Sequence, residues 1–240
     1  MRVRSRFDTP IIVALDFAEL SIAIDFAKRL DPNLCKVKVG KELFTNSGPA
    51  VVDRLQNLGF EVFLDLKFHD IPKTVYGAVK QAASMGVWMV NVHAAGGGRM
   101  LFSAKEAILN FDKPPILVAV TVLTSMEQDD LSGIGIYTPV AEQVFKLAQL
   151  SKDNGLDGVV CSAQEALELR NIFGKEFVLV APGIRSSNQP ADDQRRVVTA
   201  SKAIISGVDY LVLGRSITNA RDPLFELEVI HQELKFEKSP

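Results

Sequence analysis

Two lysines and two aspartates are spaced so that opposite charges could meet in one small space. Asp65 and Lys67 lie two residues apart at the end of an apolar run, while Asp16 and Lys38 lie at the ends of two other runs. Residues i and i+2 of a strand point to the same side, so Asp65 and Lys67 are expected on one face of their strand. Lys38, which is two residues from Lys36 on the neighbouring strand, can face the same space. An ammonium group held among carboxylates could stabilise developing negative charge and donate a proton.

The simplest alternative is an ion pair that only closes a layer of buried side chains, and one isolated pair would favour it. Four converging charges favour catalysis instead, because burying charged groups for stability alone seldom repays their desolvation.

Two turns that combine glycine with arginine predict a phosphate site. Gly183 precedes Ile184-Arg185, and Gly214 precedes Arg215, each after an apolar run. Glycine lets the backbone approach an anion closely, and backbone N–H groups with a cation are a common phosphate grip. Either turn alone would be ordinary turn chemistry. The long polar stretch 185–195 is expected to form a lid over this site.

The histidines and a serine give weaker signals. His93 is expected to be a hydrogen-bonding residue at a strand end, since no second metal ligand stands at helical or strand spacing from it. His69 lies near carboxylates but has no further ligand partner, and His231 is expected on a solvated helix face. Ser125 lacks the Gly-x-Ser-x-Gly elbow of a nucleophile. Metal chemistry and acyl transfer are therefore disfavoured.

The elements that must position these residues alternate between strand and helix eight times. The expected strands are short, apolar and unalternating, as in a parallel sheet buried on both faces; they span residues 11–15, 34–39, 61–66, 89–92, 116–120, 158–160, 177–180 and 210–213. The expected helices span residues 19–30, 49–58, 72–85, 99–109, 139–154, 163–172, 199–206 and 223–234. Glycines follow five of these helices, where a left-handed terminating residue is favoured.

Eight such units in 240 residues predict a single-domain TIM (β/α)8 barrel over residues 1–240, with residues 1–8 as a short N-terminal extension. The main alternative is a doubly wound open sheet, but no Gly-x-Gly-x-x-Gly follows the first strand. In a barrel, the polar residues at the carboxyl ends of the strands form the site.

Composition narrows the class of protein further. Apolar residues make up 47% and charged residues 23%, typical of globular chains and unlike disordered or fibrous ones. The net charge of −2 predicts no general attraction to nucleic acid or an anionic membrane. No signal core or membrane-spanning run is evident, so a cytoplasmic location is expected. Cys35 and Cys161 are expected to be buried, reduced thiols.

Over nearly its whole length the chain resembles the bacterial orotidine 5′-monophosphate decarboxylases. The motifs that carry this resemblance occur in the family's order: Val13-Ala14-Leu15-Asp16, Val37-Lys38-Val39-Gly40, Phe63 through Pro72, Val92-His93-Ala94-Ala95-Gly96, Val122-Leu123-Thr124-Ser125, Ala181-Pro182-Gly183-Ile184-Arg185, Asp193-Gln194 and Gly214-Arg215-Ser216-Ile217. The Asp-x-Lys-x-x-Asp core alone is shared with a wider superfamily, so the later motifs carry the specificity.

The resemblance implies a homodimeric barrel that converts orotidine monophosphate to uridine monophosphate and CO₂ without a metal or an organic cofactor. The catalytic residues that it implies are Lys38, Asp65, Lys67 and Asp70. The implied binding residues are Asp16 and Lys38 for the ribose, Asp65 beside the leaving carboxylate, Ser125 for the pyrimidine, Thr124 as a further binding position, and Arg185, Gln194, Gly214 and Arg215 for the phosphate. Asp70, Ile71 and Thr74 would be supplied to the partner subunit's site.

Two other functions remain open at the level of sequence. The first is a sugar-phosphate decarboxylase or aldolase of the same superfamily, acting through a Mg²⁺-stabilised enediolate; the lysine-rich stretch from Lys38 to Lys41 before Glu42 disfavours a cation site there. The second is a noncatalytic sensor of a phosphorylated ligand on a barrel scaffold. It would explain the glycine-arginine turns but would leave Lys67 without a role.

Overall fold

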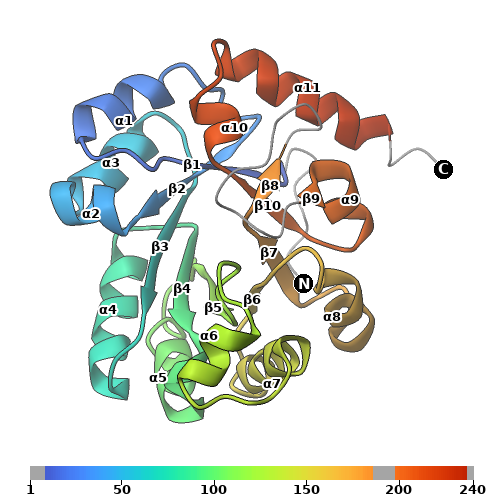
Figure 1. Cartoon of the computed structure of the whole chain (residues 1–240). Helices are drawn as coiled ribbons and strands as arrows, with labels where there is room; N and C mark the ends of the chain where they lie inside the picture. The colour runs from blue at the N-terminus through green and yellow to red at the C-terminus, as the bar shows by residue number, and fades with distance from the viewer. Residues whose placement is uncertain (1–8, 186–197, 237–240) are drawn as a thin grey trace.

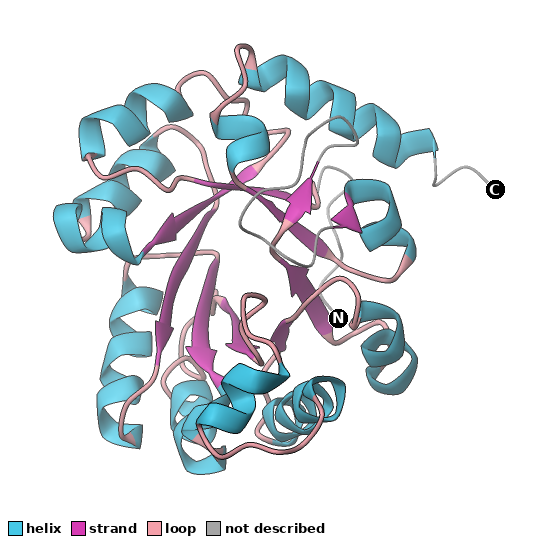
Figure 2. Ribbon diagram, in the orientation of Figure 1, coloured by secondary structure: helices cyan, strands magenta, loops and turns pink. Residues whose placement is uncertain are grey.

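The computed structural model of the chain describes residues 9–185 and 198–236. Eight parallel strands close into a barrel in the order β1-β10-β7-β6-β5-β4-β3-β2. Helices form a ring around these strands (Figures 1 and 2). The prediction of a closed barrel is confirmed. The extension expected at residues 1–8 and nearly all of the expected lid lie outside the described residues.

The barrel strands are β1 (Ile11–Ala14), β2 (Lys36–Gly40), β3 (Val62–Phe68), β4 (Met89–His93), β5 (Ile116–Val120), β6 (Gly158–Val160), β7 (Val178–Ala181) and β10 (Tyr210–Leu213). The helices that match the expected ones are α1 (Leu20–Ala27), α3 (Ala50–Asn57), α4 (Pro72–Ser84), α5 (Gly98–Glu106), α7 (Val140–Asp153), α8 (Ala166–Phe173), α9 (Ala200–Ile205) and α11 (Pro223–Phe236). Elements that the sequence pattern missed are α2 (Lys41–Ser47), α6 (Gln128–Gly133), α10 (Arg215–Thr218), the 3-10 turn η1 (Ala94–Gly96) and the small pair β8 (Ile184–Arg185) and β9 (Val198–Thr199).

Alternate residues of each strand divide the apolar core into two layers. In β1, Ile11 and Val13 pack among residues shared with the surrounding helices, whereas Ile12 belongs to a second cluster that fills the barrel. In β3, Phe63 belongs to the inner cluster and Leu64 to the outer one. Both faces of each strand are therefore buried, which explains the unalternating apolar runs. The same alternation turns Lys38 and Asp65 toward the barrel interior.

The lower part of the barrel holds a buried lysine that is separate from the charges at the carboxyl ends. Lys36 is 4% exposed, and its ammonium lies 2.9 Å from Glu61 Oε2. The same ammonium lies 4.8 Å from the ring centroid of Trp88, which packs edge-on against Tyr210. Lys36 and Lys38 thus share the inward face of β2, but Lys36 makes its contacts at the amino-terminal end of the barrel, which we call the barrel floor.

Arg170 joins four elements beneath the barrel. Its guanidinium, on α8, donates hydrogen bonds to the backbone oxygens of Gly174 and Phe177, which precede β7. It also donates to the oxygen of Gly207, after α9, and forms an ion pair with Asp209, before β10. Both partners of the ion pair are largely buried, so this contact fixes how α8 and α9 meet the strands.

We expect Arg170→Met to lower the free energy of unfolding by about 3 kcal/mol, because the buried carboxylate of Asp209 loses its cationic partner. Denaturant unfolding measures the change. The control is Arg54→Met, which removes an exposed arginine on α3 and is expected to change stability by less than about 0.5 kcal/mol. Equal effects of the two substitutions would contradict a structural role for Arg170.

The prediction of a solvated His231 is wrong. The ring on α11 is partly buried, and Nε2 lies 2.6 Å from the backbone oxygen of Leu34, to which it donates a hydrogen bond. It also lies 3.3 Å from Thr9 Oγ1. The last helix is thereby tied to the first described residues and to the segment before β2. In the described part of the chain, no helix combines the length and the apolar character needed to cross a membrane.

Candidate active site

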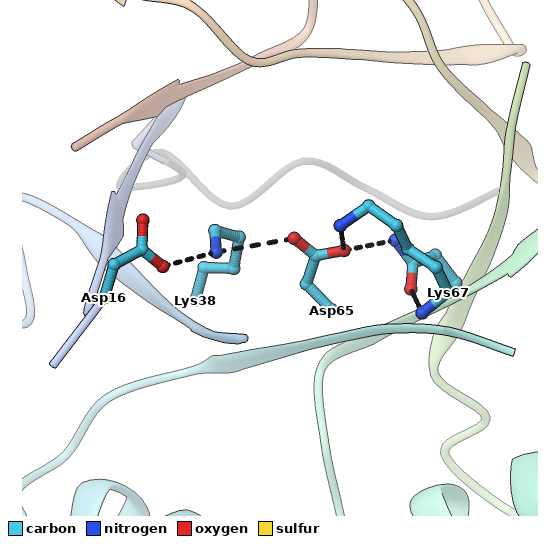
Figure 3. A network of polar contacts seen from close by, with 5 residues as sticks. Asp16, Lys38, Asp65 and Lys67 are labelled. Atoms are coloured by element: carbon cyan, nitrogen blue, oxygen red, sulfur yellow. Dashed lines mark hydrogen bonds and ion pairs between the residues drawn. The ribbon is translucent and has the colours of Figure 1, made fainter. Parts of the chain in front are cut away.

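Four charged side chains form a row of alternating sign at the carboxyl ends of three adjacent strands (Figure 3). Lys38 Nζ lies 3.0 Å from Asp16 Oδ1 and 3.4 Å from Asp65 Oδ2. Asp65 Oδ1 in turn accepts a hydrogen bond from Lys67 Nζ at 2.7 Å. The Lys38 and Asp65 side chains are 10% and 11% exposed, and that of Lys67 is 27% exposed. A partly open ammonium therefore ends a row whose centre is fixed by buried ion pairs.

An irregularity in β3 places Lys67. Leu64 pairs with Val90 and Phe68 pairs with Val92, so four residue steps on β3 face two on β4. Within this bulge, Lys67 has a φ of 51°, and it is the one non-glycine residue with positive φ in the described part of the chain. Left-handed backbone is costly for a side chain as large as lysine. The regular spacing assumed from the sequence is therefore wrong at Lys67, although its ammonium still meets Asp65.

Asp65 remains ionised despite its burial. Burial alone would raise the pKa of this carboxyl group, but the positive charges of Lys38 and Lys67 lower it. Hydrogen bonds from Lys67 and Asn91 lower it further, and the net pKa is below the ordinary aspartate value. The site therefore holds a fixed negative charge next to the more exposed ammonium.

His93 lies at the end of β4, where its ring centroid is 5.5 Å from that of His69. Burial lowers the pKa of His93, and the positive charges of His69, Lys67 and Lys41 lower it further. Asp65 acts in the opposite direction without reversing the shift. His93 is thus biased toward its neutral form.

This bias predicts a pH-dependent part of the stability. Between the lowered pKa of native His93 and the ordinary value near 6.5, the unfolded chain binds more protons than the native one. The free energy of unfolding should therefore fall as pH is lowered through this window. We expect His93→Gln to remove that part of the slope in denaturant unfolding between about pH 7 and 5. Parallel curves for the two proteins would contradict the lowered pKa.

The remaining predicted site residues are distributed over the loops that follow the strands. Thr124 and Ser125 follow β5, with Thr124 partly buried and Ser125 exposed. Asp70 and Thr74 are also exposed, and the carboxylate of Asp70 accepts a hydrogen bond from the backbone N–H of Ile71. In the isolated chain, Asp70, Ile71 and Thr74 take no part in the ion pairs that form the row of charges.

The two glycine-arginine turns are only partly described. Gly183 has a φ of 76°, the left-handed conformation that favours glycine. Gly214 precedes α10, and a Cβ added there would meet a single neighbour, the side chain of Ala14 at 4.0 Å, so space remains above its backbone. Arg215 begins α10 and is exposed. The backbone of Arg185 forms part of β8, whereas Gln194 lies outside the described residues.

Sequence reasoning gave Asn91 no role, although its position at the end of the fourth strand was evident. Its side chain is fully buried and contacts both Asp65 and Lys67. The alternation of side chains along β4 was the available signal in the sequence, because it points the polar amide of Asn91 into the apolar interior of the barrel. As for metals, the described residues contain no cluster of three or more histidine, cysteine or acidic side chains suited to hold an ion.

Comparisons with known proteins agree on one family. The model of the orotidine 5′-phosphate decarboxylase / HUMPS family matches residues 9–230. The orotidine 5′-phosphate decarboxylase of Chromobacterium violaceum is 56% identical over 230 residues, covering 96% of this chain and 93% of that protein. The enzyme of the same name from Saccharophagus degradans is 52% identical over 227 residues, covering 95% of each chain.

Solved structures give the same result. The crystal structure of orotidine 5′-phosphate decarboxylase from Lactobacillus acidophilus matches with a TM-score of 0.85 at 39% identity, covering 95% of this chain and 99% of that one. The enzyme from Pyrococcus horikoshii matches with a TM-score of 0.74 at 23% identity, over 94% of this chain and 99% of that one. The second match supports the fold alone.

Proposed function

Because the chain belongs to the orotidine 5′-phosphate decarboxylase / HUMPS family, we propose that it converts orotidine 5′-monophosphate to uridine 5′-monophosphate and CO₂, the last step of de novo UMP (pyrimidine) biosynthesis. We further propose that it works in the cytoplasm, as a homodimer, and without a metal or an organic cofactor. The observation that carries the proposal is the row of Asp16, Lys38, Asp65 and Lys67, which presents an ammonium beside a buried carboxylate.

The chemistry of the substrate explains why such a row is needed. When the bond between C6 and the carboxylate breaks, CO₂ leaves and the electron pair stays on C6, in the plane of the pyrimidine. The ring π system cannot delocalise an in-plane pair, and no cofactor supplies an electron sink. Stabilisation must then be electrostatic, from charge that is already in position. The Lys67 ammonium supplies a positive charge, and its N–H proton then forms the new C6–H bond.

The other members of the row hold Lys67 and the substrate in place. Asp65, kept ionised by its neighbours, lies beside the substrate carboxylate and raises the energy of the ground state. Lys38, between Asp16 and Asp65, fixes the geometry of the row. Asp16 is 65% exposed and, with Lys38, contacts the ribose. Ser125, on the loop after β5, contacts the pyrimidine, and Thr124 beside it is a further binding position.

The phosphate is held at the side of the barrel mouth opposite Lys67, at the turns that follow β7 and β10. Backbone N–H groups at Gly214 and the side chain of Arg215 form the grip together with Arg185 and Gln194, of which Gln194 lies outside the described residues. The open space above Gly214 supports this placement. Binding energy from the phosphate offsets the cost of orienting the reacting part of the substrate, so a substrate that lacks the phosphate loses turnover as well as affinity.

Asp70, Ile71 and Thr74 act in the partner subunit's site. Asp70 is exposed in the single chain and lies next to Ile71, an apolar side chain that is 66% exposed. Tyr76 on α4 and Phe102 on the adjoining α5 are also exposed, at 37% and 54%. Exposed apolar side chains around a functional carboxylate are typical of a surface that another subunit covers.

The function is tested by mixing purified protein with orotidine monophosphate in the presence of EDTA. Loss of orotate absorbance and release of CO₂ are followed together. Rapid turnover that resists EDTA supports the proposal. If a folded dimer shows no turnover, sugar phosphates with added Mg²⁺ should be assayed next, and ligand binding without turnover would then favour a sensor.

Arg215→Ala is expected to lower kcat/KM for orotidine monophosphate by at least about 10²-fold, because a charge-assisted contact to the phosphate is lost. The variant should change the much slower decarboxylation of orotidine, which has no phosphate, by less than about threefold. Comparing both substrates in wild type and variant measures the difference. An equal loss with orotidine would contradict the phosphate grip.

A further inference from the structure

Asn91 connects the two residues at the end of the charged row. It lies on β4 with no exposed surface, and the alternation of that strand turns it, like Met89, into the barrel. Its Oδ1 accepts a hydrogen bond from the backbone N–H of Lys67 at 2.8 Å. Its Nδ2 donates one to Asp65 Oδ1 at 2.7 Å. One amide therefore holds the backbone of one residue and the carboxylate of the other.

The backbone contact occurs where β3 and β4 lose their regular pairing. The register shifts between Leu64 and Phe68, and Lys67 adopts its left-handed conformation inside that interval. Such a conformation persists only where the surroundings hold it. The Asn91 carbonyl supplies a fixed acceptor at this point, so the direction in which the Lys67 side chain leaves the strand depends on Asn91.

The side-chain contact fixes the rotation of the Asp65 carboxylate. Oδ1 accepts from both Asn91 and Lys67, while Oδ2 faces Lys38 at 3.4 Å. The charged or titratable groups around Asp65 are Lys38 from β2, Lys67 from β3 and His93 from β4, with Asp16 beyond Lys38. Asn91 is the neutral donor among them. It can stabilise the carboxylate without placing another charge in the site.

We propose that Asn91 is a positioning residue for the decarboxylation, which sets the backbone of Lys67 and the carboxylate of Asp65 so that the ammonium meets the reacting carbon. The inference rests on the proposed function, and Asn91 itself does not contact the substrate. A merely structural role, filling a gap beside the bulge, predicts lost stability without a specific effect on turnover.

Two substitutions of similar size separate these roles. Asn91→Leu removes both hydrogen bonds, and we expect kcat to fall by about 10²-fold with KM within about threefold, because misplacement acts on the chemical step. Asn91→Asp keeps an acceptor for the Lys67 N–H but sets a second carboxylate against Asp65. We expect a smaller loss of kcat and an acid limb of the kcat profile at higher pH, since a neighbouring negative charge raises a carboxyl pKa.

The control is Ser151→Ala, which removes a fully buried hydroxyl whose hydrogen bond stays within α7. It should lower stability without moving kcat or the pH profile. If Asn91→Leu, folded and dimeric, keeps kcat within threefold of wild type, or loses activity only through KM, the proposal is overturned. If Asn91→Leu does not fold, an unchanged pH profile of kcat in Asn91→Asp overturns the proposal equally.

A measurement without substrate separates this inference from the proposed function. In wild type and Asn91→Asp, carboxyl carbon NMR follows the titration of Asp65, and proton–nitrogen NMR follows the backbone amide of Lys67. We expect the pKa of Asp65 to rise in the variant while the Lys67 amide keeps a shift close to that of wild type. An unchanged Asp65 titration overturns the inference. A wild type that titrates as expected but does not consume orotidine monophosphate overturns the proposed function instead.

Discussion

Lys67→Ala is expected to lower kcat for orotidine monophosphate by about 10⁴-fold or more. In the proposed mechanism, the substitution removes two contributions at once: the positive charge beside the developing carbanion and the proton that replaces CO₂. General acid catalysis alone is worth about 10² to 10⁴ in rate, and one electrostatic donor about 10² to 10³. Steady-state rates measured from the loss of orotate absorbance give the change, and activity within tenfold of wild type would contradict the role of Lys67.

A second substitution at the same position tests the chemistry rather than the presence of charge. Lys67→Arg keeps a cation, but a guanidinium remains protonated and has a different shape, so it is a poor proton donor. We expect it to stay at least about 10²-fold below wild type in kcat. Binding of uridine monophosphate, measured by calorimetry, should survive in both variants, because the ribose and phosphate contacts proposed above come from other residues. Loss of binding in both would indicate a damaged site instead.

Much of the site could be predicted because barrel topology brings strand ends together. Once eight apolar runs alternate with helices, Asp16, Lys38 and Asp65 must lie at neighbouring strand ends, whatever the details of packing. The row of alternating charge in the structure follows from that topology. Helix α10 was missed because its four residues make too few turns for a periodic pattern.

Local geometry could not be predicted from spacing. The spacing of Lys36 and Lys38 predicted the same inward face for both. Lys36 nevertheless contacts Glu61 and Trp88 at the barrel floor, whereas Lys38 joins the site. The difference arises because the two ammonium groups lie at different depths in the barrel. Nothing in the sequence indicated the bulge at Lys67, since it arises from tertiary pairing with β4. The same pairing gives Asn91 its two contacts and therefore its importance.

Mixing two inactive variants is expected to restore activity if Asp70 acts across a dimer interface. In a mixed dimer of Lys67→Ala and Asp70→Ala subunits, one site lacks both residues. The other site combines the intact Lys67 of its own subunit with the intact Asp70 of its partner. A twofold-symmetric dimer therefore regains one of its two sites, or about half of wild-type turnover per mixed dimer. If Asp70 served its own subunit, both sites of the mixed dimer would stay inactive.

The exposure of Asp70 in the single chain makes this a sharp experiment, because its carboxylate accepts a hydrogen bond from Ile71 and takes no part in the ion pairs of the row that it would complete. Two different affinity tags allow the mixed dimer to be purified and its composition verified before the assay. The two variants are unfolded and refolded together to form the mixed dimer. Each parent variant treated alone in the same way is the control and should stay inactive. A verified mixed dimer without activity would place Asp70 in its own subunit's chemistry or outside the chemistry altogether. Recovery near half of wild-type turnover would show that each site contains residues from both chains. Dilution below the dimer dissociation constant should then abolish turnover even in the wild type.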